Sequence, residues 1–328
     1  MRNFLAITIA FLLSGSAAMV SIPCIAQTTD TESDFRWNVL RDRAELFDGD
    51  GEALAYVFQS GNRPIVYPVV GPGGLAMTRD YPMKPVSGKG TRDHVHHRSI
   101  WMTHGIVNGV DFWAEEAVEP DQRFGRVVHD KVVSHTVSDG TATLETTANW
   151  ITPDDEVVLL EKRKMIVAGD REHREIEFIF DLFADKDAVV FGDTKEGTFG
   201  IRVPDSMMVD AQLGGLIVNE HGQTNSDAWG QRASWVDYSG PVDGRTMGIT
   251  VLEHPTSYGH PCRWHVRTYG LFAANPFGKV DFTQQKATKV HRLMPGKSLR
   301  LRYKILLHAG GADNESINRK WAAFAESE

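Results

Sequence analysis

The chain has 328 residues, 41% of them hydrophobic, and a formal net charge of −8 at pH 7. The negative charge and the lack of a long basic run argue against nucleic acid as a partner. Beyond the first 26 residues, no stretch approaches the roughly 18 consecutive apolar residues of a membrane span, so no stable membrane insertion is expected.

The amino terminus has the pattern of a secretory signal peptide. Arg2 gives a positive start, residues 4–20 form an apolar run, and Ala26 ends a short segment of small residues. We therefore expect a signal peptide over residues 1–26 with cleavage near Ala26. The mature protein is then periplasmic or secreted, and its remaining residues, 27–328, are expected to form a single domain.

Strand signals begin soon after this segment. Apolar runs at 37–47 and 54–59 flank an Asp-Gly-Asp-Gly sequence at 48–51, which is typical of a hairpin turn. A further short strand is expected at 64–70. A surface loop rich in proline, glycine and lysine at 81–90 then leads into the next segment.

That next segment, D-H-V-H-H-R-S-I-W-M-T-H-G-I-V-N-G-V-D-F-W at 93–113, holds four histidines. If the chain is extended there, its side chains alternate, so His94, His96 and His104 share one face and His97 takes the other. The shared face could bind one divalent transition metal or one substrate. Structural histidines in a polar loop are the alternative, but so many titratable groups in one place favour a site.

Strand signals are strongest in the middle of the chain. Apolar runs at 127–137 and 141–151 flank Asp139-Gly140 and predict a long hairpin. Further strands are expected at 156–167 and 173–183. The charged residues of the latter are expected on a solvated sheet face.

The end of the chain predicts a closing hairpin and one helix. Segments 290–294 and 298–308 flank a Pro-Gly turn signal. Residues 313–324 have helical apolar spacing, and Asp313 is the expected N-cap. Many strands, frequent turns and almost no helix predict an all-β fold, a large antiparallel sandwich or barrel.

Two later motifs also carry chemically versatile side chains. K-E-G-T-F-G-I-R-V at 195–203 contains Glu196, and W-H-V-R-T-Y-G-L-F-A-A-N-P-F-G at 264–278 contains His265, Arg267 and Tyr269. On a strand, the last three would point the same way and could bind an oxygen-rich ligand. An ordinary exposed strand face is the alternative.

The three motifs together resemble the family labelled "methane oxygenase PmoA", over most of the chain after residue 26. That family is similar to the galactose-mutarotase-like supersandwich. The resemblance implies a large antiparallel β-sandwich with a short C-terminal helix and a concave, sugar-binding face. A methane monooxygenase subunit is built of apolar membrane helices, which this sequence lacks, so methane chemistry is not expected.

The resemblance directs attention to a carbohydrate or other small-molecule substrate. Sugars are bound by aromatic faces and by hydrogen-bonding side chains, and the candidates here are Arg98, Trp101, Asn108, Asp111, Trp113, Arg267, Tyr269 and Asn275.

We expect epimerase, hydrolase or lyase chemistry on a sugar, a glycoside or an oxidised sugar. Glu196 is expected to act as base or substrate anchor, and His97 or His265 as acid. His94, His96 and His104 are left for a metal or a second substrate contact. The three motifs are expected to meet in one cleft.

Two other functions remain open. A non-catalytic carbohydrate-binding protein would use the aromatic residues but not the titratable cluster. A metal-dependent oxygenase of cupin type often opens with His-x-His, but it needs a glutamate a few residues later, and no carboxylate follows His96 before Asp111. We therefore favour the enzyme over the binding protein, and the binding protein over the oxygenase.

Overall fold

The computed structural model describes residues 1, 34–86, 88, 90–117, 122–285 and 291–328. The contacts within the chain define a folded unit, Glu32–Glu328, separate from residues 1–31. The expected signal peptide, apart from Met1, lies outside the described residues. No helix in the described part of the chain is both long and apolar enough to cross a membrane.

The first of two large sheets carries all three sequence motifs. Its strands are antiparallel neighbours in the order β1 (Phe35–Val39), β2 (Arg43–Asp48), β3 (Gly51–Ser60), β4 (Arg63–Val69), β5 (Ile100–His104), β11 (Gly197–Arg202), β16 (Leu271–Asn275) and β15 (Arg263–Val266).

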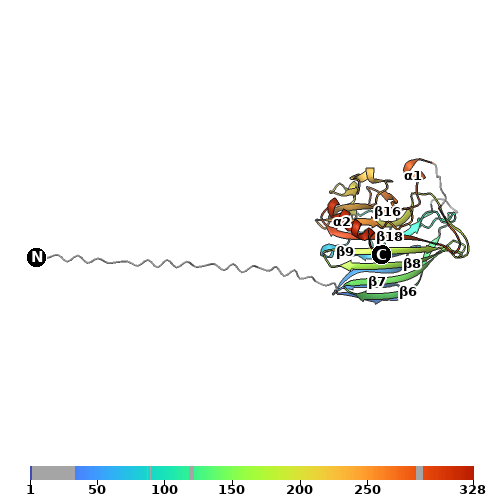
Figure 1. Ribbon diagram of the computed structural model, residues 1–328, viewed down its shortest axis with the longest axis horizontal. Helices are drawn as coiled ribbons and strands as arrows, with labels where there is room; N and C mark the ends of the chain where they lie inside the picture. Colours follow the sequence, from blue (N-terminus) through green and yellow to red (C-terminus); the bar gives the residue numbers. More distant parts are fainter. Residues whose placement is uncertain (2–33, 87, 89, 118–121, 286–290) are drawn as a thin grey trace. The chain divides into compact units, whose positions relative to one another are not determined.

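The second sheet is formed mainly by the middle and the end of the chain, and several of its strands are labelled in Figure 1. Its antiparallel order is β12 (Leu216–Asn219), β13 (Trp235–Val242), β14 (Arg245–Glu253), β18 (Ser298–Ala309), β9 (Arg174–Phe183), β8 (Val157–Gly169), β7 (Thr141–Ile151) and β6 (Arg126–Ser138).

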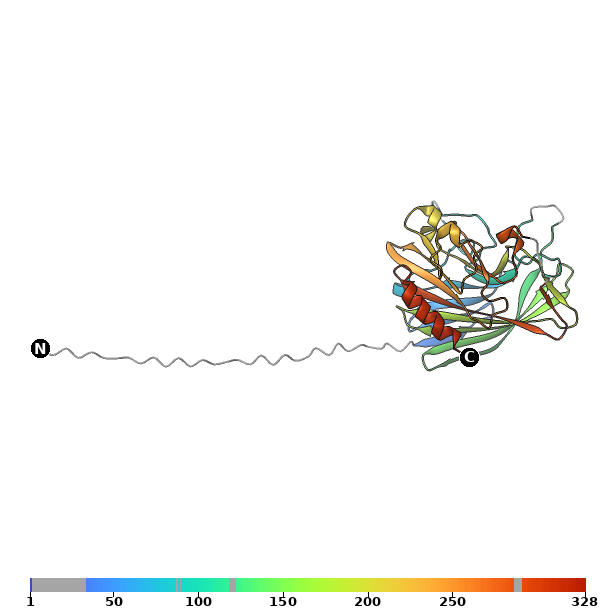
Figure 2. The same ribbon diagram turned by 45° about the horizontal axis from the view of Figure 1, so that its top comes forward.

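The smaller elements lie around these sheets. A two-stranded ladder pairs β10 (Val189–Phe191) with β17 (His291–Leu293), and α1 (Val280–Thr283) is a single helical turn. Helix α2 (Asn314–Ala325) lies across strands of the folded unit, as Figure 2 shows in red.

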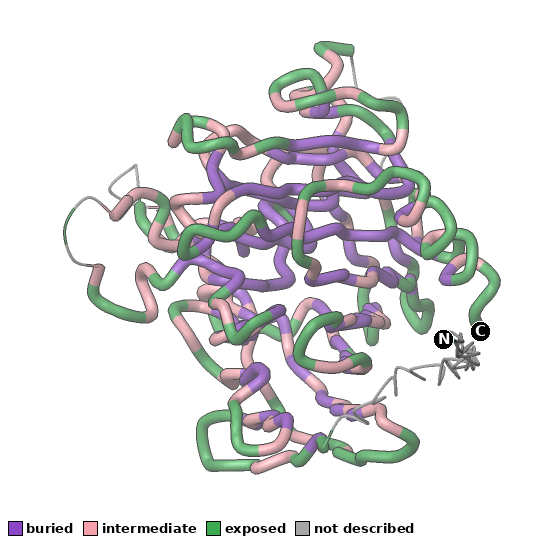
Figure 3. The backbone as a smooth tube through the Cα atoms, turned by 90° about the vertical axis from the view of Figure 1, so that its left-hand side faces the viewer, coloured by how far each residue is buried: buried purple, intermediate pink, exposed green. Residues whose placement is uncertain are grey.

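The hydrophobic core lies between the two large sheets, where the tube in Figure 3 is mostly purple. In β7 every second residue is buried, as expected for a strand with one face on a core. Rings from both sheets meet there: Phe199 of β11 lies 5.1 Å from Phe178 of β9 and 5.0 Å from Tyr303 of β18. This arrangement confirms the expected all-β sandwich.

The glycine-containing hairpins also form as predicted. Asp139 and Gly140 join β6 to β7 with φ angles of 50° and 68°. Two positive φ angles match the two-residue turn that follows the natural twist of paired strands. The predicted helix is confirmed as well, because Oδ1 of Asp313 accepts a hydrogen bond from the backbone N–H of Ser316 at 3.1 Å.

The predicted closing hairpin is wrong. The Pro-Gly turn forms, and the N–H of Lys297 donates to the carbonyl of Met294 at 3.0 Å. The strands on either side then separate: β17 pairs with β10, whereas β18 pairs with β9 and β14. A turn signal fixes a local reversal of the chain, but it does not fix which strands pair beyond it.

The expectation of solvated charges on 173–183 is also wrong in part. Arg174 is buried at the end of the core face and binds Asp48, with nitrogen and oxygen 2.7 Å apart. Glu177, on the opposite face, is buried beneath Arg302, which donates to it at 2.7 Å. Both charges are buried because each one has a partner from a distant segment.

One row of residues across the first sheet underlies the candidate site. The register places Ile65, Trp101, Gly200, Ala273 and His265 opposite one another on five neighbouring strands, so they share the face turned away from the sandwich core. Gly200 has no side chain, so the Trp101 ring lies directly over it.

Gly200 is therefore expected to be sensitive to even one added methyl group. A Cβ at this position would lie 2.5 Å from the Trp101 ring, and both residues are fixed by paired strands. We predict that Gly200→Ala lowers the free energy of unfolding by about 1–3 kcal/mol, as overpacking usually does. Denaturant unfolding measures this change.

The matched control is Gly311→Ala, where the added Cβ would meet its nearest atom at an ordinary 3.8 Å. Its effect should be much smaller. Equal unfolding midpoints for wild type and Gly200→Ala would contradict the close packing of Trp101 on β11.

Candidate functional site

The first three histidines lie in a turn before β5, and not on a strand. The N–H of His97 donates to the carbonyl of His94 at 2.9 Å, and His94 and Ser99 have φ angles of 46° and 53°. The predicted alternation of faces does not apply to such a turn. Instead the rings cluster, with centroids 4.7 Å apart for His94 and His97 and 4.5 Å apart for His96 and His97.

His104 does not join this cluster. It lies at the end of β5, buried on the core side, with its ring 4.9 Å from that of Phe277. Its Nε2 is 2.8 Å from the carbonyl of Gly192. Burial is the main reason why its pKa is lowered to about 4, so the ring is neutral near pH 7.

The expected metal site is therefore not formed by His94, His96 and His104. In the described ranges, no group of three or more His, Cys, Asp and Glu side chains is arranged to hold a metal ion. The expectation failed because the alternation of faces requires residues 94–104 to form one continuous extended segment. The residues in place do not fit the expected divalent transition metal.

A layer of aromatic rings covers the outer face of the first sheet. His97 stacks on Trp101 at 5.4 Å, and Trp101 lies 5.2 Å from Trp113. His94 stacks on Tyr269 at 5.1 Å with the planes 6° apart. The first motif thus contacts the third through this ring pair.

Asp93 links the same layer to β11. Arg79 and Arg202 both bind its carboxylate, at 2.7 and 3.0 Å. Nη1 of Arg202 also lies 3.2 Å from Nδ1 of His97. Burial raises the pKa of Asp93, but Arg202, His94 and Arg79 outweigh it and hold the pKa well below its ordinary value.

A second pair of arginines shares Glu115. The fully buried Arg63 lies 3.3 Å from this carboxylate, and Arg98 lies 2.7 Å from it. Arg98 also donates to the hydroxyl of Ser60 at 3.2 Å. Arg98 was predicted to contact the substrate, but its side chain is already paired with Glu115 and Ser60.

Two other predicted substrate contacts, Asn108 and Asp111, hold the backbone. Asn108 lies in an exposed turn and accepts from the N–H of Val190 at 2.7 Å. Asp111 accepts from the N–H groups of Trp113 and Ala114. Both side chains therefore fix turns, and Asn108 lies apart from the ring layer.

Asn275 fixes the segment that leads to Glu196. Its side-chain nitrogen donates to the carbonyls of Thr194 and Lys195 at 2.9 and 3.0 Å, and its oxygen accepts from the N–H groups of Phe277 and Gly278. Asn275 is completely buried, so it positions Glu196 rather than meeting a ligand.

Glu196 and His265 lie close to each other on the same face. Oε2 of Glu196 lies 4.0 Å from Nδ1 of His265. The Glu196 side chain is 34% exposed and pairs with Lys195 at 2.7 Å, whereas His265 is 2% exposed. Nδ1 of His265 is buried and has no hydrogen-bond partner among the described residues.

Burial has the largest effect on the pKa of His265. Burial, then Arg267 and Lys195, lower its pKa to about 3. Burial likewise lowers the pKa of His96 to about 3, and that of His97 well below its ordinary value. These rings are neutral near pH 7 and offer a lone pair for a proton or a hydrogen bond.

The three motifs therefore meet on one face. Arg202 of the second motif contacts His97 of the first, His94 contacts Tyr269 of the third, and Glu196 faces His265. Six residues of this face were not predicted to have a role, although Asp93 and Arg202 lie within the first and second motifs: Arg63, Arg79, Asp93, Glu115, Arg202 and Trp229.

A hollow of about 440 Å³ adjoins the ring layer on the same face of the sheet. Val57, Ile65 and Tyr67 line it, and Ile65 and Tyr67 pack in one cluster with Trp101 and Trp113. A ligand larger than one sugar ring would have space to extend from the ring layer into this hollow.

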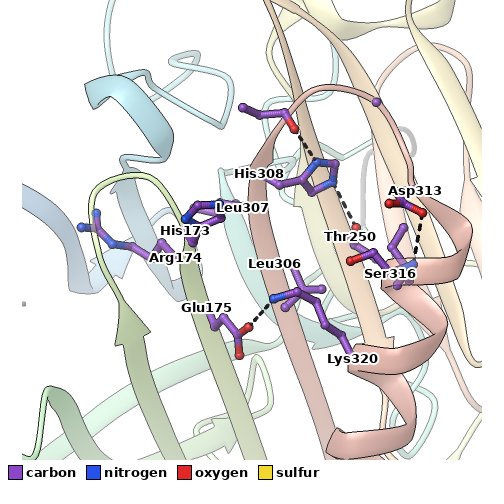
Figure 4. A pocket seen from close by; sticks show the side chains of 13 residues that line it. His173, Arg174, Glu175, Thr250, Leu306, Leu307, His308, Asp313, Ser316 and Lys320 are labelled. Carbon is purple, nitrogen blue, oxygen red and sulfur yellow. Dashed lines mark hydrogen bonds and ion pairs between the residues drawn. The ribbon is translucent and has the colours of Figure 1, made fainter. Parts of the chain in front are cut away.

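Another hollow, of about 180 Å³, lies on the second sheet beside α2 (Figure 4). Its polar groups are already paired: Lys320 binds Glu175 at 2.9 Å, and His308 binds the buried Asp237 at 2.8 Å. The Lys320 pair joins the helix to the sheet, and the His308 pair joins two strands of the sheet, so we place the candidate site on the first sheet.

The comparisons with known proteins give a family but no activity. The model of a family described as "Family of unknown function (DUF6807)" matches residues 44–322. No curated protein matches this chain.

Solved structures with a similar arrangement share little sequence. The GH36 alpha-galactosidase AgaB from Geobacillus stearothermophilus is 9% identical, with a TM-score of 0.44 over 84% of this chain and 41% of that chain. The galactose 1-epimerase from Lactobacillus acidophilus NCFM is 9% identical, with a TM-score of 0.37 over 85% of this chain and 99% of that chain. The chain thus spans about two fifths of the galactosidase.

His104 should behave as a structural residue. We predict that His104→Leu, which leaves the Gly192 carbonyl without its donor, destabilises the protein by about 1–3 kcal/mol more than His104→Gln, whose side-chain amide can still donate. Thermal or denaturant unfolding of both variants measures the difference. Equal stability of the two variants would mean that the hydrogen bond to Gly192 contributes nothing.

Proposed function

We propose that this chain, which belongs to the DUF6807 family of unknown function, is a carbohydrate-active enzyme that works by proton transfer at Glu196 and His265. Its substrate is a sugar, a glycoside or an oxidised sugar, and its reaction is of the epimerase, hydrolase or lyase type. The observation that carries the proposal is the 4.0 Å separation between Glu196 and the unpartnered Nδ1 of His265.

This separation suits a substrate atom between the two side chains. One substrate hydroxyl can approach Nδ1 of His265 to hydrogen-bond distance, about 2.7–3.0 Å, and donate its single proton to this nitrogen. Glu196 covers His265 in the free protein, but its ion pair with Lys195 is partly exposed and so holds it only weakly. A bound sugar can therefore displace the carboxylate slightly and reach the ring.

The charge states of the two side chains suggest their roles. We assign the neutral His265 ring as the acceptor of the substrate proton, and the nearby Glu196 carboxylate stabilises the imidazolium that forms. With a pKa of about 3, the ring is a weak base in the free protein. The proton returns to the product in a later step. This role differs from the sequence-based expectation, which assigned His265 or His97 as the acid.

The surrounding residues support binding. Tyr269 and His94 form a stacked aromatic pair at the mouth, and aromatic faces bind the apolar face of a sugar ring. This pair also favours the second candidate function, a non-catalytic carbohydrate-binding protein. In that case the Glu196 and His265 side chains would serve as hydrogen-bond partners only.

The metal-dependent oxygenase receives no support from the arrangement of ligands. His104 is separated from His94 and His96, and Nδ1 of His94 is bonded to Asp93 at 2.5 Å. The matched family is described as one of unknown function, and not as methane oxygenase PmoA.

The catalytic proposal is tested by Glu196→Gln and His265→Asn. On a substrate that the wild type converts, both should lower kcat by about 10²–10⁴-fold, because each removes a group that carries or stabilises the transferred proton. Loss of a single substrate hydrogen bond would cost only about 1 kcal/mol of binding. The assay uses a panel of glycosides, free aldoses and their keto forms.

The controls are Glu315→Gln and His221→Ala, which remove exposed side chains of the same types. They should retain wild-type turnover, and melting temperatures should show that all four variants are folded. If Glu196→Gln and His265→Asn both match the wild type, the catalytic roles are wrong and the binding-protein candidate replaces them.

The pH dependence gives an independent check. A base must be unprotonated to act, and the folded pKa of His265 is about 3. The acidic limb of the kcat/KM profile should therefore lie well below pH 6.5. An acidic limb near pH 6.5 that disappears in His265→Asn would contradict the depressed pKa of this ring.

We also propose that the protein is exported after cleavage near Ala26. Its apolar run at 4–20 and the small residues before residue 27 motivate this. Amino-terminal sequencing of the protein from the producing cell should give a chain that starts near residue 27. A chain that still begins at Met1 would contradict export by this signal.

A further inference from the structure

Arg267 differs from the other arginines of the site. Its guanidinium lies 5.6 Å from the ring centre of Trp229 and 5.5 Å from that of Tyr269. In the part of the chain that the structure describes, its side chain has no carboxylate partner and no hydrogen bond. The two rings hold the guanidinium in place while its N–H groups stay free for a ligand.

The neighbouring arginines are already neutralised in part. Arg79 and Arg202 share Asp93, and Arg63 and Arg98 share Glu115. These four side chains support the fold of the site. A ligand with a negative charge would therefore find its free partner at Arg267.

Two further carboxylates act on these arginines without binding them directly. The charge of Asp111 acts on Arg63, and that of Asp205 acts on Arg79. With Asp93 and Glu115 they offset the charge of the four arginines, so Arg267 is the cation that can attract an anionic substrate, an effect that weakens with added salt.

We infer that the substrate is a sugar acid whose carboxylate binds Arg267. This inference rests on the proposed function and names the class of sugar for the same site. A carboxylate matches one edge of the planar guanidinium with two parallel hydrogen bonds. A single free guanidinium also balances a single negative charge, whereas a phosphate dianion would leave charge uncompensated.

The position of Arg267 places this carboxylate beside the proton-transfer pair. Arg267 directly follows β15 and lies two residues after His265. Along an extended chain this spacing puts their Cα atoms about 6.6 Å apart. One sugar ring can therefore reach both side chains. Tyr269, which stacks on His94, closes the same side of the site.

Binding of the substrate carboxylate should also raise the pKa of His265. Burial is the main cause of its low pKa, and the Arg267 charge is the next. The charges of Lys195 and His94 lower the pKa further, whereas a hydrogen bond with the backbone of Lys195 raises it. A bound carboxylate offsets the Arg267 charge, so His265 becomes a stronger base when the substrate is in place.

The test measures binding by calorimetry at pH 7 and low salt. The ligands are D-galacturonate and D-glucuronate, their neutral parents D-galactose and D-glucose, and D-glucose 6-phosphate. Wild-type protein should bind one of the two acids about 10- to 100-fold more tightly than its neutral parent, as expected for charge-assisted hydrogen bonds. Arg267→Gln should remove this preference, and Arg267→Lys should retain only part of it.

The matched control is Arg319→Gln, which removes an exposed arginine on α2 that pairs with Glu315. It should retain the preference for the acid, which excludes a mere change in total charge. Melting temperatures of the variants establish that each is folded.

The outcomes separate this inference from the proposed function. Equal binding of acid and parent sugar, with turnover of a neutral sugar that Glu196→Gln abolishes, overturns the sugar acid and leaves the enzyme. Tighter binding of D-glucose 6-phosphate than of either acid overturns the carboxylate in favour of phosphate. An unchanged preference in Arg267→Gln overturns the role of Arg267. If no sugar binds, both proposals are wrong.

Proton NMR titration of His265 gives a readout that does not depend on turnover. The pKa of His265 should rise in Arg267→Gln, and it should rise in the wild type when the preferred acid is added. An unchanged titration in both experiments would mean that Arg267 does not act on His265.

Discussion

The backbone register that joins β5, β11, β16 and β15 is the constraint on which the rest of the site depends. It places Trp101, Gly200, Ala273 and His265 in one row, although they are separated by up to 172 positions in the sequence (273 − 101). A slip of one residue in any pairing would turn that strand's side chains to the other face. The small residues in the middle of the row then set how closely the rings pack.

Charge is distributed on this scaffold in two ways. Arg63, Arg79, Arg98 and Arg202 are paired with carboxylates, and a buried charge without such a partner would be costly. Arg267 is half-buried and lies between two rings without a carboxylate partner among the described residues. The same burial that requires pairs for the arginines keeps His96, His97 and His265 neutral. The face therefore combines fixed positive charge with neutral bases.

Local sequence signals predicted local structure well. The Asp139-Gly140 turn and the Asp313 cap each depend on residues within a few positions, and both are confirmed. Motif density also directed attention to one face of the first sheet, where the segments of His97, Glu196 and His265 do meet. The ligand set with His104 failed because it assumed that residues 94–104 form one strand. A turn at His94 and Ser99 breaks that regularity.

The sequence by itself determined the all-β class, most strand positions, the terminal helix and the residue types available for chemistry, since these follow from periodicity, turn residues and composition. Only the tertiary structure decided which of those residues act together. It buried His104 in the core, engaged Asn275 and Arg98 in internal contacts, and left Arg267 without a carboxylate partner among the described residues. Strand pairing between distant segments and the burial it produces are properties of the whole fold, and no local pattern encodes them.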